Sequence, residues 1–273
     1  GVPLWTTGRG HPDAFYLTDV LPANPGLEIA YVMETRQASG GLNVVDARTG
    51  KTLWKLDAAT KHVHGKGMCA DIDPTLPGQE VYGADAEGHV LTASRWLFAA
   101  DGTLLRQGKD CPWGFDISTL YWDADLQQEL LAGKVVDYQG GPVGGTIRGS
   151  RVLLADVIGD WREEVIVSVA GELRIICTPI AAMDRRVCLM QDPVYRMVTA
   201  MDAMGYTQPP TLSYNPELLS PNLNLTVLEA AAVPTVRVVV SAPSATALAG
   251  RLVLDAGTGL QADPATFDVR LNP

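Results

Sequence analysis

Short apolar runs alternate with turns along most of the chain, and this pattern predicts strands rather than helices. Residues 42–54 show an apolar run, a glycine-containing turn and a second run, and residues 96–105 repeat this arrangement around an Asp-Gly turn. No helical pattern of ten or more residues stands out. The 27 glycines and 18 prolines also favour short strands joined by many turns. The predicted class is therefore all-β.

A pattern of acidic turn, glutamate and apolar run recurs four times. Its glutamates are Glu28, Glu80, Glu129 and Glu164, so that successive copies are separated by 52, 49 and 35 residues. Intervals of this length suit one small antiparallel sheet each. The favoured architecture is a set of radially stacked four-stranded sheets, as in a β-propeller, ahead of a β-sandwich and of a solenoid.

The composition changes where the glutamate repeat ends. Residues 1–214 are expected to form the repeat-containing domain, and residues 215–232, rich in Asn, Pro, Leu and Ser, are expected to form a linker. Residues 233–273 contain two strand-like runs that suit the first strands of a β-sandwich-like module. Because such a short stretch is small for an independent domain, we expect a partial module or one that packs against the main body.

An excess of acidic residues narrows the classes of partner. The chain has 21 Lys and Arg against 31 Asp and Glu, a net charge of -10. This negative charge argues against a nucleic acid or an anionic membrane surface as the main binding partner. No run reaches the roughly 18 apolar residues of a membrane-spanning helix. Residues 1–5 lack the charged and apolar regions of a signal peptide, so any export signal is expected upstream of Gly1.

The acidic turns of the repeat predict calcium sites. Calcium takes six to eight oxygen ligands, which aspartates on a turn and a glutamate on the next strand can supply. In the alternative, the aspartates cap turns and the glutamates lie on exposed strand edges. The trailing glutamate in every copy favours calcium, mostly as structural ions at the rim of each sheet. The expected ligands are Asp19, Glu28, Asp71, Asp73, Glu80, Asp123, Asp125, Glu129, Asp156, Asp160 and Glu164.

Basic residues beside glycines form a second group of candidates. His11, Lys66 and Arg148 are remote in sequence, but the loops of a propeller converge on one axial face, where they could line a pocket for an anionic sugar. The alternative is that these residues lie in solvated loops. His62 and His64 share one face of an extended segment and could bind zinc, although no third ligand is evident.

The four cysteines form no Cys-x-x-Cys pair. Cys177 and Cys188 lie 11 residues apart on two apolar runs that could form a hairpin. Both a cross-strand disulfide and two buried free thiols are compatible with this spacing.

Four longer motifs occur in the order in which a known family has them. They are GKGMCADIDP at 65–74, YWDADLQQELL at 121–131, ADVIGDWREEVI at 155–166, and QDPVYR followed by GYTQPP within 191–210. Over about residues 5–214 the chain resembles the rhamnogalacturonan lyases of polysaccharide lyase family 11. The resemblance implies an eight-bladed β-propeller, roughly twice as long as this stretch, of which the chain provides the C-terminal blades.

The same resemblance implies an activity, a cofactor and a substrate. The expected reaction is β-elimination at the rhamnose–galacturonate bond of rhamnogalacturonan I, the branched backbone of pectin, with calcium as cofactor. The expected protein is a monomer, secreted by a bacterium. The alternative function is a calcium-stabilised propeller that binds polysaccharide or protein without catalysis.

The family's motifs also indicate site residues. The expected catalytic residues are His11, Lys66, Arg148 and Tyr206, and the expected substrate-binding residues are Gly145, Thr146 and Arg148. Tyr206 or His11 would transfer protons, and Lys66 and Arg148 would bind carboxylate. Arg148 stands where the family has lysine; a guanidinium is a poor general base but still binds carboxylate. Gly145 stands where the family has asparagine, which removes a side-chain ligand for a calcium near the substrate.

Overall fold

The structure is a computed structural model that describes most of the chain. The described residues are 1–65, 67–88, 90–114, 117–182, 186–202 and 208–216, together with the backbone of the strands at 222–228, 235–241, 248–253 and 266–271. The chain divides into two compact units, residues 1–183 with 187–215, and residues 184–186 with 216–273. Within the described residues, no helix has the length and apolar composition that crossing a membrane requires.

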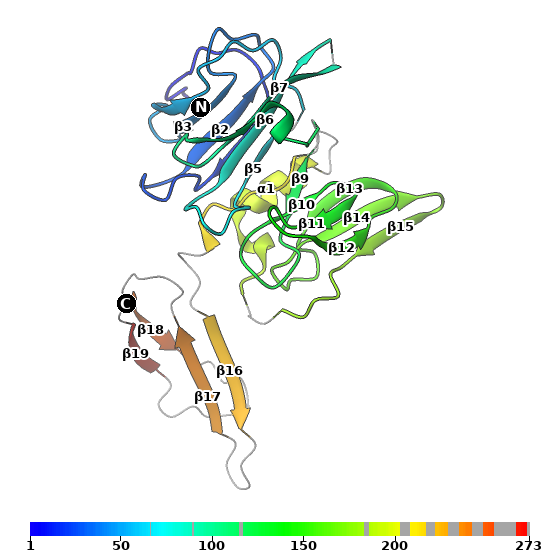
Figure 1. Cartoon of the computed structure of the whole chain (residues 1–273). Coiled ribbons are helices and arrows are strands. Elements are labelled where there is room, and N and C mark those ends of the chain that lie inside the picture. The colour runs from blue at the N-terminus through cyan, green and yellow to red at the C-terminus, as the bar shows by residue number, and fades with distance from the viewer. Residues whose placement is uncertain are drawn as a thin grey trace. The chain divides into compact units, whose positions relative to one another are not determined.

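Four small antiparallel sheets follow one another along the first unit (Figure 1). The first contains β1 (Pro12–Thr18), β2 (Glu28–Met33), β3 (Leu42–Asp46) and β4 (Thr52–Lys55). The second contains β5 (Met68–Ala70), β6 (Glu80–Glu87), β7 (Val90–Phe98) and β8 (Leu104–Gln107). The third contains β9 (Ser118–Leu120), β10 (Glu129–Leu131), β11 (Lys134–Val136) and β12 (Pro142–Thr146). The fourth contains β13 (Ser150–Ala155), β14 (Glu164–Val169) and β15 (Glu172–Ile176).

This arrangement confirms the all-β class and the propeller-like succession of sheets. Strands that are neighbours in sequence pair within each sheet. The repeat found in the sequence corresponds to the sheets, because the glutamate of each copy is the first residue of the second strand of its sheet. The hairpins predicted at residues 42–54 and 96–105 are present as β3–β4 and β7–β8.

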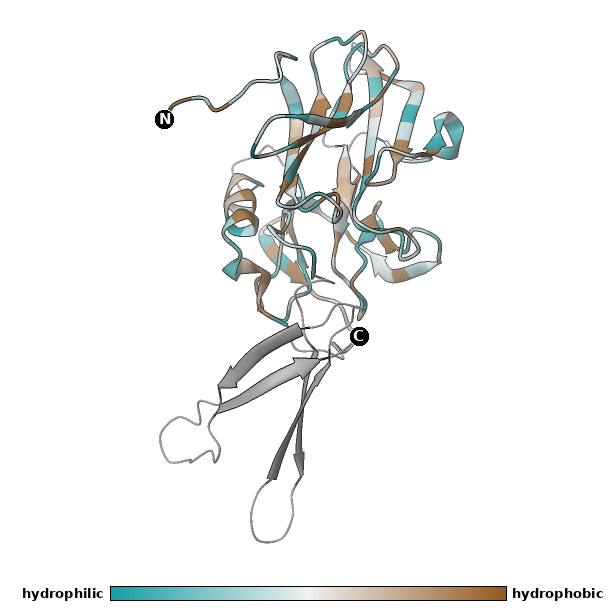
Figure 2. Cartoon of the chain, turned by 90° about the vertical axis from the view of Figure 1, so that its left-hand side faces the viewer, coloured by the Kyte–Doolittle hydropathy of each residue, from teal (hydrophilic) through white to brown (hydrophobic). Residues whose placement is uncertain are grey.

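Apolar side chains from neighbouring sheets form shared clusters. Along the strands of the first unit, hydrophobic segments alternate with more polar ones (Figure 2). Val44 of the first sheet packs in one cluster with Val81 of the second. Met68 of the second sheet belongs to a cluster with Leu130 of the third. A third cluster joins the third and fourth sheets. Because burial of one such side chain stabilises a fold by about 1.5–3 kcal/mol, each sheet depends on its neighbour for its core.

The helix α1 (Pro193–Asp202) is a departure from the expectation of no helix of this length. Its start is well defined, since Oδ1 of Asp192 accepts the backbone N–H groups of Val194 (2.7 Å) and Tyr195 (3.0 Å). Its buried residues include polar ones, which weakens the apolar periodicity that would have predicted it. They are Tyr195, Val198, Thr199 and Asp202. Two single-turn 3₁₀ helices are also present, Gly108–Asp110 and Leu189–Gln191.

The last residues of the first unit form hydrogen bonds with its first strand, β1. Gln208 donates a hydrogen bond from Nε2 to the carbonyl oxygen of Phe15 (2.7 Å), and the Thr211 hydroxyl donates to that of Leu17 (3.0 Å). Because β1 is an edge strand of its sheet, some of its carbonyl groups have no neighbouring strand to pair with. Side chains from much later in the chain donate hydrogen bonds to two of them.

The described strands of the second unit form two antiparallel pairs. They are formed by β16 (Asn222–Leu228) with β17 (Thr235–Ser241) and by β18 (Leu248–Val253) with β19 (Thr266–Leu271). The units divide near residue 215, where the composition changes, and β16 lies within the span that was expected to be a linker.

The four cysteines are free. The disulfide considered for Cys177 and Cys188 is therefore absent. The alternative of two buried thiols is also wrong, because Cys177 is exposed and Cys188 is only partly buried.

Candidate functional site

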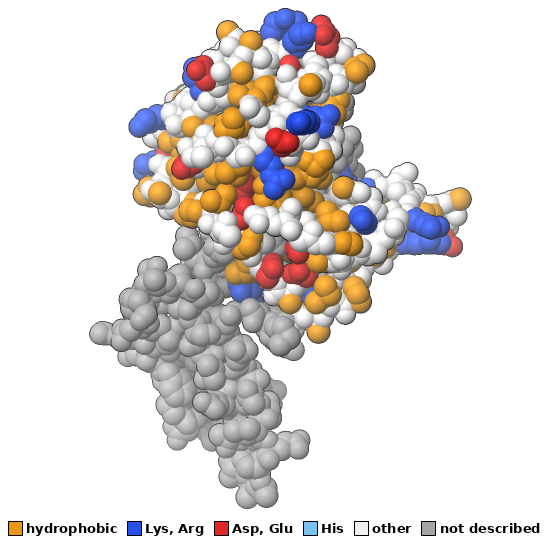
Figure 3. Space-filling view, viewed as in Figure 1, with side chains coloured by type: hydrophobic (Ala, Val, Ile, Leu, Met, Phe, Trp, Pro, Cys, Tyr) orange, Lys and Arg blue, Asp and Glu red, His pale blue; other side chains and the backbone are white. Residues whose placement is uncertain are grey.

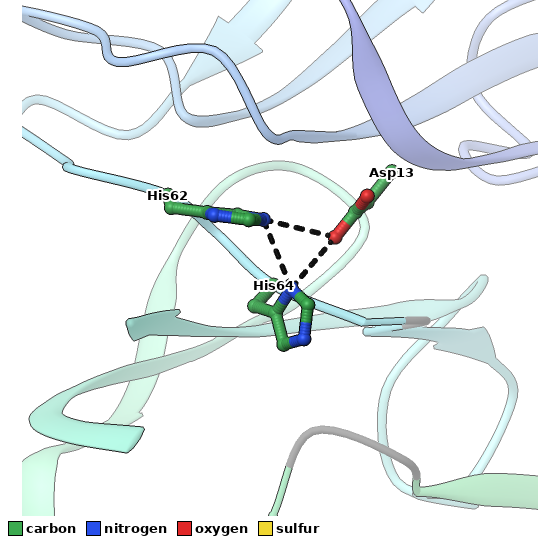
Figure 4. Close-up of side chains that lie close together, drawn as sticks. All are labelled: Asp13, His62 and His64. Carbon is green, nitrogen blue, oxygen red and sulfur yellow. Dashed lines mark hydrogen bonds and ion pairs between the residues drawn. The ribbon is translucent and has the colours of Figure 1, made fainter. Parts of the chain in front are cut away.

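Histidines and carboxylates gather at the junction of the first two sheets (Figure 4). Asp13 lies on β1 and His11 directly precedes it, whereas Glu34 directly follows β2. His62 and His64 lie on the segment that leads from the first sheet to the second. We call these five residues the histidine–carboxylate cluster.

The segment that carries the two histidines is extended and held between both sheets. Val63 donates its backbone N–H to the carbonyl oxygen of Met33 (3.1 Å) and forms a β-bridge with Asp85. Its side chain is fully buried. Because alternate side chains of an extended segment point to opposite sides, burial of Val63 directs His62 and His64 to the same side, as expected from their spacing.

The carboxylate of Asp13 lies at the centre of the cluster, with its side chain only 3% exposed. Its Oδ2 atom accepts the backbone N–H of Gly65 (2.8 Å). The same Oδ2 lies 3.2 Å from Nε2 of His62 and 3.1 Å from Nδ1 of His64. These two ring nitrogens are 2.9 Å apart, and the rings are nearly perpendicular, at 89°. Three potential ligand atoms thus form a triangle (Figure 4).

Glu34 connects this buried triangle to an exposed histidine. Its Oε1 lies 3.9 Å from Nε2 of His62, and its Oε2 lies 3.5 Å from Nε2 of His11. The His11 side chain is 72% exposed. His11 is therefore placed where it can exchange a proton with a bound molecule, and Glu34 is placed to orient its ring.

The other family-based site residues lie elsewhere in the described structure or outside it. Gly145 and Thr146 are exposed at the end of β12, and Arg148 is exposed in the loop that follows. No ion pair between Arg148 and a described carboxylate is formed. Lys66 and Tyr206 lie outside the described residues.

Lys and Arg side chains do not gather into one basic patch on the face that Figure 3 shows. They lie in several separate places, with acidic side chains among them. This face offers no continuous match to a nucleic-acid backbone.

The four glutamates of the repeat share one structural role. All four are buried, which rules out the interpretation that they lie on exposed strand edges. In each, Oε2 accepts backbone N–H groups from the preceding acidic turn, which fastens the turn to the second strand. The donors are Val20 and Leu21 to Glu28 (2.9 and 3.0 Å), Ile72 and Asp73 to Glu80 (3.0 and 3.1 Å), Trp122 to Glu129 (2.7 Å), and Val157 and Ile158 to Glu164 (3.0 and 3.1 Å).

Several aspartates of the repeat cap turns. Asp156 accepts the backbone N–H of Gly159 (2.7 Å) and that of Asp160 (3.1 Å) with Oδ1. Asp73 accepts both the N–H and the hydroxyl of Thr75 with Oδ1 (3.0 and 2.6 Å). These hydrogen bonds show that the aspartates cap turns, as the alternative predicted, and each carboxylate keeps lone pairs that a cation could use.

One copy of the repeat keeps its carboxylates together. Oxygen atoms of Asp123, Asp125 and Glu129 lie within 4.8 Å of one another. Burial, and then the charge of Asp123, raises the pKa of Glu129 to about 9. An oxygen-only donor set of this kind fits calcium.

Two other carboxylate oxygen atoms of the repeat also suit a calcium ion. Oδ1 of Asp19 and Oε1 of Glu80 are buried and have no hydrogen-bond partner among the described residues. Asp71 belongs to the same turn as Glu80 and is also buried.

Sequence reasoning does not single out Glu163, which is buried beside the repeat glutamate of the fourth sheet. Its Oε1 accepts the hydroxyl hydrogen of Tyr195 (2.7 Å), and its Oε2 accepts the backbone N–H of Tyr121 (2.9 Å). The same Tyr195 oxygen accepts the backbone N–H of Asp156 (2.9 Å). Burial raises the pKa of Glu163 to about 8. This carboxyl group thereby connects α1 to the third and fourth sheets.

The chain is similar to known rhamnogalacturonan lyases. It is 38% identical over 230 residues to the rhamnogalacturonan endolyase YesW of Bacillus subtilis (strain 168), covering 78% of this chain and 35% of that protein. It is 36% identical over 239 residues to the rhamnogalacturonan exolyase YesX of the same organism, covering 78% and 38%. The crystal structure of YesW matches with a TM-score of 0.65 at 36% identity, over 78% of this chain and 36% of that one.

The chain therefore spans little more than a third of the length of these relatives. Residues 1–218 match the family described as rhamnogalacturonan lyase family 11, C-terminal domain. This match covers the four sheets, α1 and the histidine–carboxylate cluster. The chain belongs to rhamnogalacturonan lyase family 11.

Proposed function

We propose that the protein containing this chain is a rhamnogalacturonan lyase that cleaves the rhamnose–galacturonate bond of rhamnogalacturonan I by β-elimination. The observation that carries the proposal is the family match over residues 1–218. An endolyase and an exolyase are both among the relatives, so the shared chemistry is lyase cleavage of rhamnogalacturonan rather than one mode of attack. A polymeric pectin substrate supports a location outside a bacterial cell.

The reaction removes a proton and a leaving group without adding water. A base takes the proton from C5 of the galacturonate, and the rhamnosyl oxygen then leaves C4 to give an unsaturated uronate. Negative charge develops beside the carboxylate in the transition state, so positive groups around that carboxylate accelerate the reaction. A calcium ion beside the uronate carboxylate would supply such charge. Asp123, Asp125 and Glu129 are the described residues whose oxygen-only donor set fits calcium, and an ion held there would fasten the acidic turn of the third sheet.

We assign two roles to described residues. Arg148 is exposed, and its planar guanidinium can bind the uronate carboxylate through two parallel hydrogen bonds. His11 is exposed beside Glu34, and a proton held on Nε2 by that carboxylate leaves Nδ1 with a lone pair that can accept the C5 proton. Carboxylate binding by Lys66 and proton transfer by Tyr206 are proposed from the family resemblance alone.

Two departures from the family pattern favour a second function. Gly145 has no side chain to offer a ligand, and Arg148 cannot act as a neutral base. A calcium-stabilised propeller that binds the polysaccharide without cleaving it would tolerate both residues.

Ultraviolet absorbance of the unsaturated uronate separates these functions. The natural polypeptide that carries residues 1–273 is incubated with rhamnogalacturonan I in calcium and again after chelation. We expect product in calcium and less after chelation. Arg148→Lys together with Gly145→Asn is expected to raise the rate, because these changes restore the family pattern. Arg174→Lys, on the exposed edge strand β15, is the matched control and should leave the rate unchanged.

The opposite result is equally informative. If no product forms while the polypeptide is retained on a rhamnogalacturonan affinity gel, the lyase proposal is refuted and the binding function is supported.

A further inference from the structure

We propose that a cavity at the outer edge of the second sheet is an additional binding site for rhamnogalacturonan, which takes a galacturonate of the polymer away from the bond that is cleaved. The inference rests on the lyase proposed above and names a further contact with its substrate. The cavity has a volume of about 410 Å³, within the range of small-ligand sites. We call it the outer cavity, and its lining includes Ser94, Arg95, Gln107, Lys109 and Asp110.

The outer cavity exists because β8 is shorter than its neighbour β7. Strand β8 has four residues and pairs only with Trp96–Phe98, so no described strand pairs with the outer side of residues 90–95. The chain leaves the sheet after Gln107 and begins a 3₁₀ helix at Gly108, whose φ is +59°. A Cβ at Gly108 would lie 3.7 Å from the carbonyl oxygen of Ala93, so this helix borders the cavity closely.

The outer cavity carries positive charge in an otherwise acidic chain. Its lining has two cations, Arg95 and Lys109, against the carboxylate of Asp110, and neither cation forms an ion pair with a described carboxylate. Arg95 donates with Nη1 to the carbonyl oxygens of Cys111 (2.9 Å) and Trp113 (3.1 Å), and neither bond uses Nη2. The guanidinium is thereby held in place with donors to spare for an anionic ligand.

The chemistry of this lining suits a sugar acid. A galacturonate residue presents one carboxylate and several hydroxyl groups. Arg95 and Lys109 can bind the carboxylate, while Ser94, Gln107 and Asp110 offer hydrogen-bond partners to hydroxyls. Asp110 would repel a more highly charged ligand such as a polyphosphate, so the cavity favours an anion of single charge.

The position of the outer cavity suits a polymer bound at the histidine–carboxylate cluster. The backbone N–H of His64 donates to the carbonyl oxygen of Ala84 on β6 (3.1 Å). Ala84 lies opposite Arg95 of β7, and the next residue of β7 lies opposite Gln107 of β8. Since neighbouring strands lie about 4.8 Å apart, the histidine segment and β8 are separated by roughly 14 Å across the second sheet. A polysaccharide chain is long enough to contact both places, whereas one sugar is not.

Binding can be measured separately from cleavage. The natural polypeptide that carries residues 1–273 is run in native gels with increasing amounts of rhamnogalacturonan I, in the cold and with a chelator so that cleavage is slow. Lys109→Gln is expected to weaken binding roughly threefold to fivefold, the upper range for an exposed ion pair. Lys51→Gln removes the same charge from an exposed position before β4 and should bind as the parent does.

Ala93 provides a test that removes no existing contact, because this exposed residue of β7 also lines the outer cavity. Ala93→Glu adds a like charge beside the bound carboxylate and is expected to weaken binding roughly tenfold. Ala93→Gln adds nearly the same volume without charge and should weaken it less. On rhamnogalacturonan I whose carboxyl groups have been reduced to alcohols, Lys109→Gln should bind as the parent does, and Ala93→Glu should bind as Ala93→Gln does.

Thermal unfolding shows that each variant is folded before its binding is compared. The additional site is refuted if the parent is not retarded by the polymer, if Lys109→Gln and Ala93→Glu bind as the parent does, if Lys51→Gln weakens binding as much as Lys109→Gln, or if the effect of Lys109→Gln persists on the reduced polymer. Failure of the lyase proposal is distinguishable: weaker binding by Lys109→Gln without any unsaturated product refutes cleavage and supports the site.

Discussion

Replacing Glu163 by glutamine is expected to remove a pH-dependent loss of stability. The pKa of this buried carboxyl rises from 4.5 to about 8 in the folded protein, so the folded state holds a proton that the unfolded state has released. The contribution of Glu163 to the free energy of unfolding therefore falls as the pH rises from about 4.5 to about 8, and then levels off. At about 1.36 kcal/mol per pKa unit, the loss over this window reaches at most about 5 kcal/mol.

Glutamine suits the site because it resembles the protonated carboxyl. Its oxygen can accept the backbone N–H of Tyr121, and its amide group can donate to the Tyr195 oxygen, so the geometry around Glu163 is kept. The variant should match the parent near pH 5 and exceed its stability near pH 9 by a few kcal/mol.

Urea unfolding at pH 5, 7 and 9 provides the measurement. Glu172→Gln is the control, because Glu172 lies exposed on β15. The free energy of unfolding of this variant should change with pH in the same way as that of the parent. Equal pH slopes for Glu163→Gln and the parent would refute the reasoning, since they would show that Glu163 does not take up a proton on folding.

Two further predictions concern the repeat. Gly78→Ala should destabilise the protein by at least about 2 kcal/mol more than Gly26→Ala in urea unfolding, because both have positive φ (+86° and +114°) but only a Cβ at Gly78 would lie 2.4 Å from the Val20 carbonyl oxygen. Equal losses of stability in the two variants would show that the backbone near Val20 moves enough to accommodate a Cβ at position 78. Asp125→Asn should weaken calcium binding roughly tenfold in calorimetric titration, because Asp125 and Glu129 belong to the oxygen-only group. An unchanged affinity would place calcium elsewhere.

The sequence predicts the sheets well because the information for each is local. The Asp-Gly turn between β7 and β8 and the glutamate at the start of each second strand are visible in short windows. Helix α1 escapes the same reasoning, since Thr199 and Asp202 interrupt its apolar face and only the Asp192-Pro193 start marks it. Its burial depends on contacts with distant residues, such as that of Tyr195 with Glu163.

The candidate site is predicted less completely than the fold. The spacing of His62 and His64 shows that they face one side, but the carboxylate that lies between them, Asp13, is 49 residues before His62. No local pattern connects these positions, and only the packing of the first two sheets brings them together. The repeat glutamates are recognisable in the sequence, whereas their bonds to backbone N–H groups depend on the path of each turn.

The contacts of Gln208 and Thr211 with β1 have a consequence for synthesis. They join residues 193 and 194 positions apart, so the ribosome makes nearly the whole first unit before they can form. At about 5–20 residues per second, this takes roughly 10–40 seconds. During that time the carbonyl groups of Phe15 and Leu17 lack these partners, and the nascent chain carries an uncovered edge strand open to pairing with another chain.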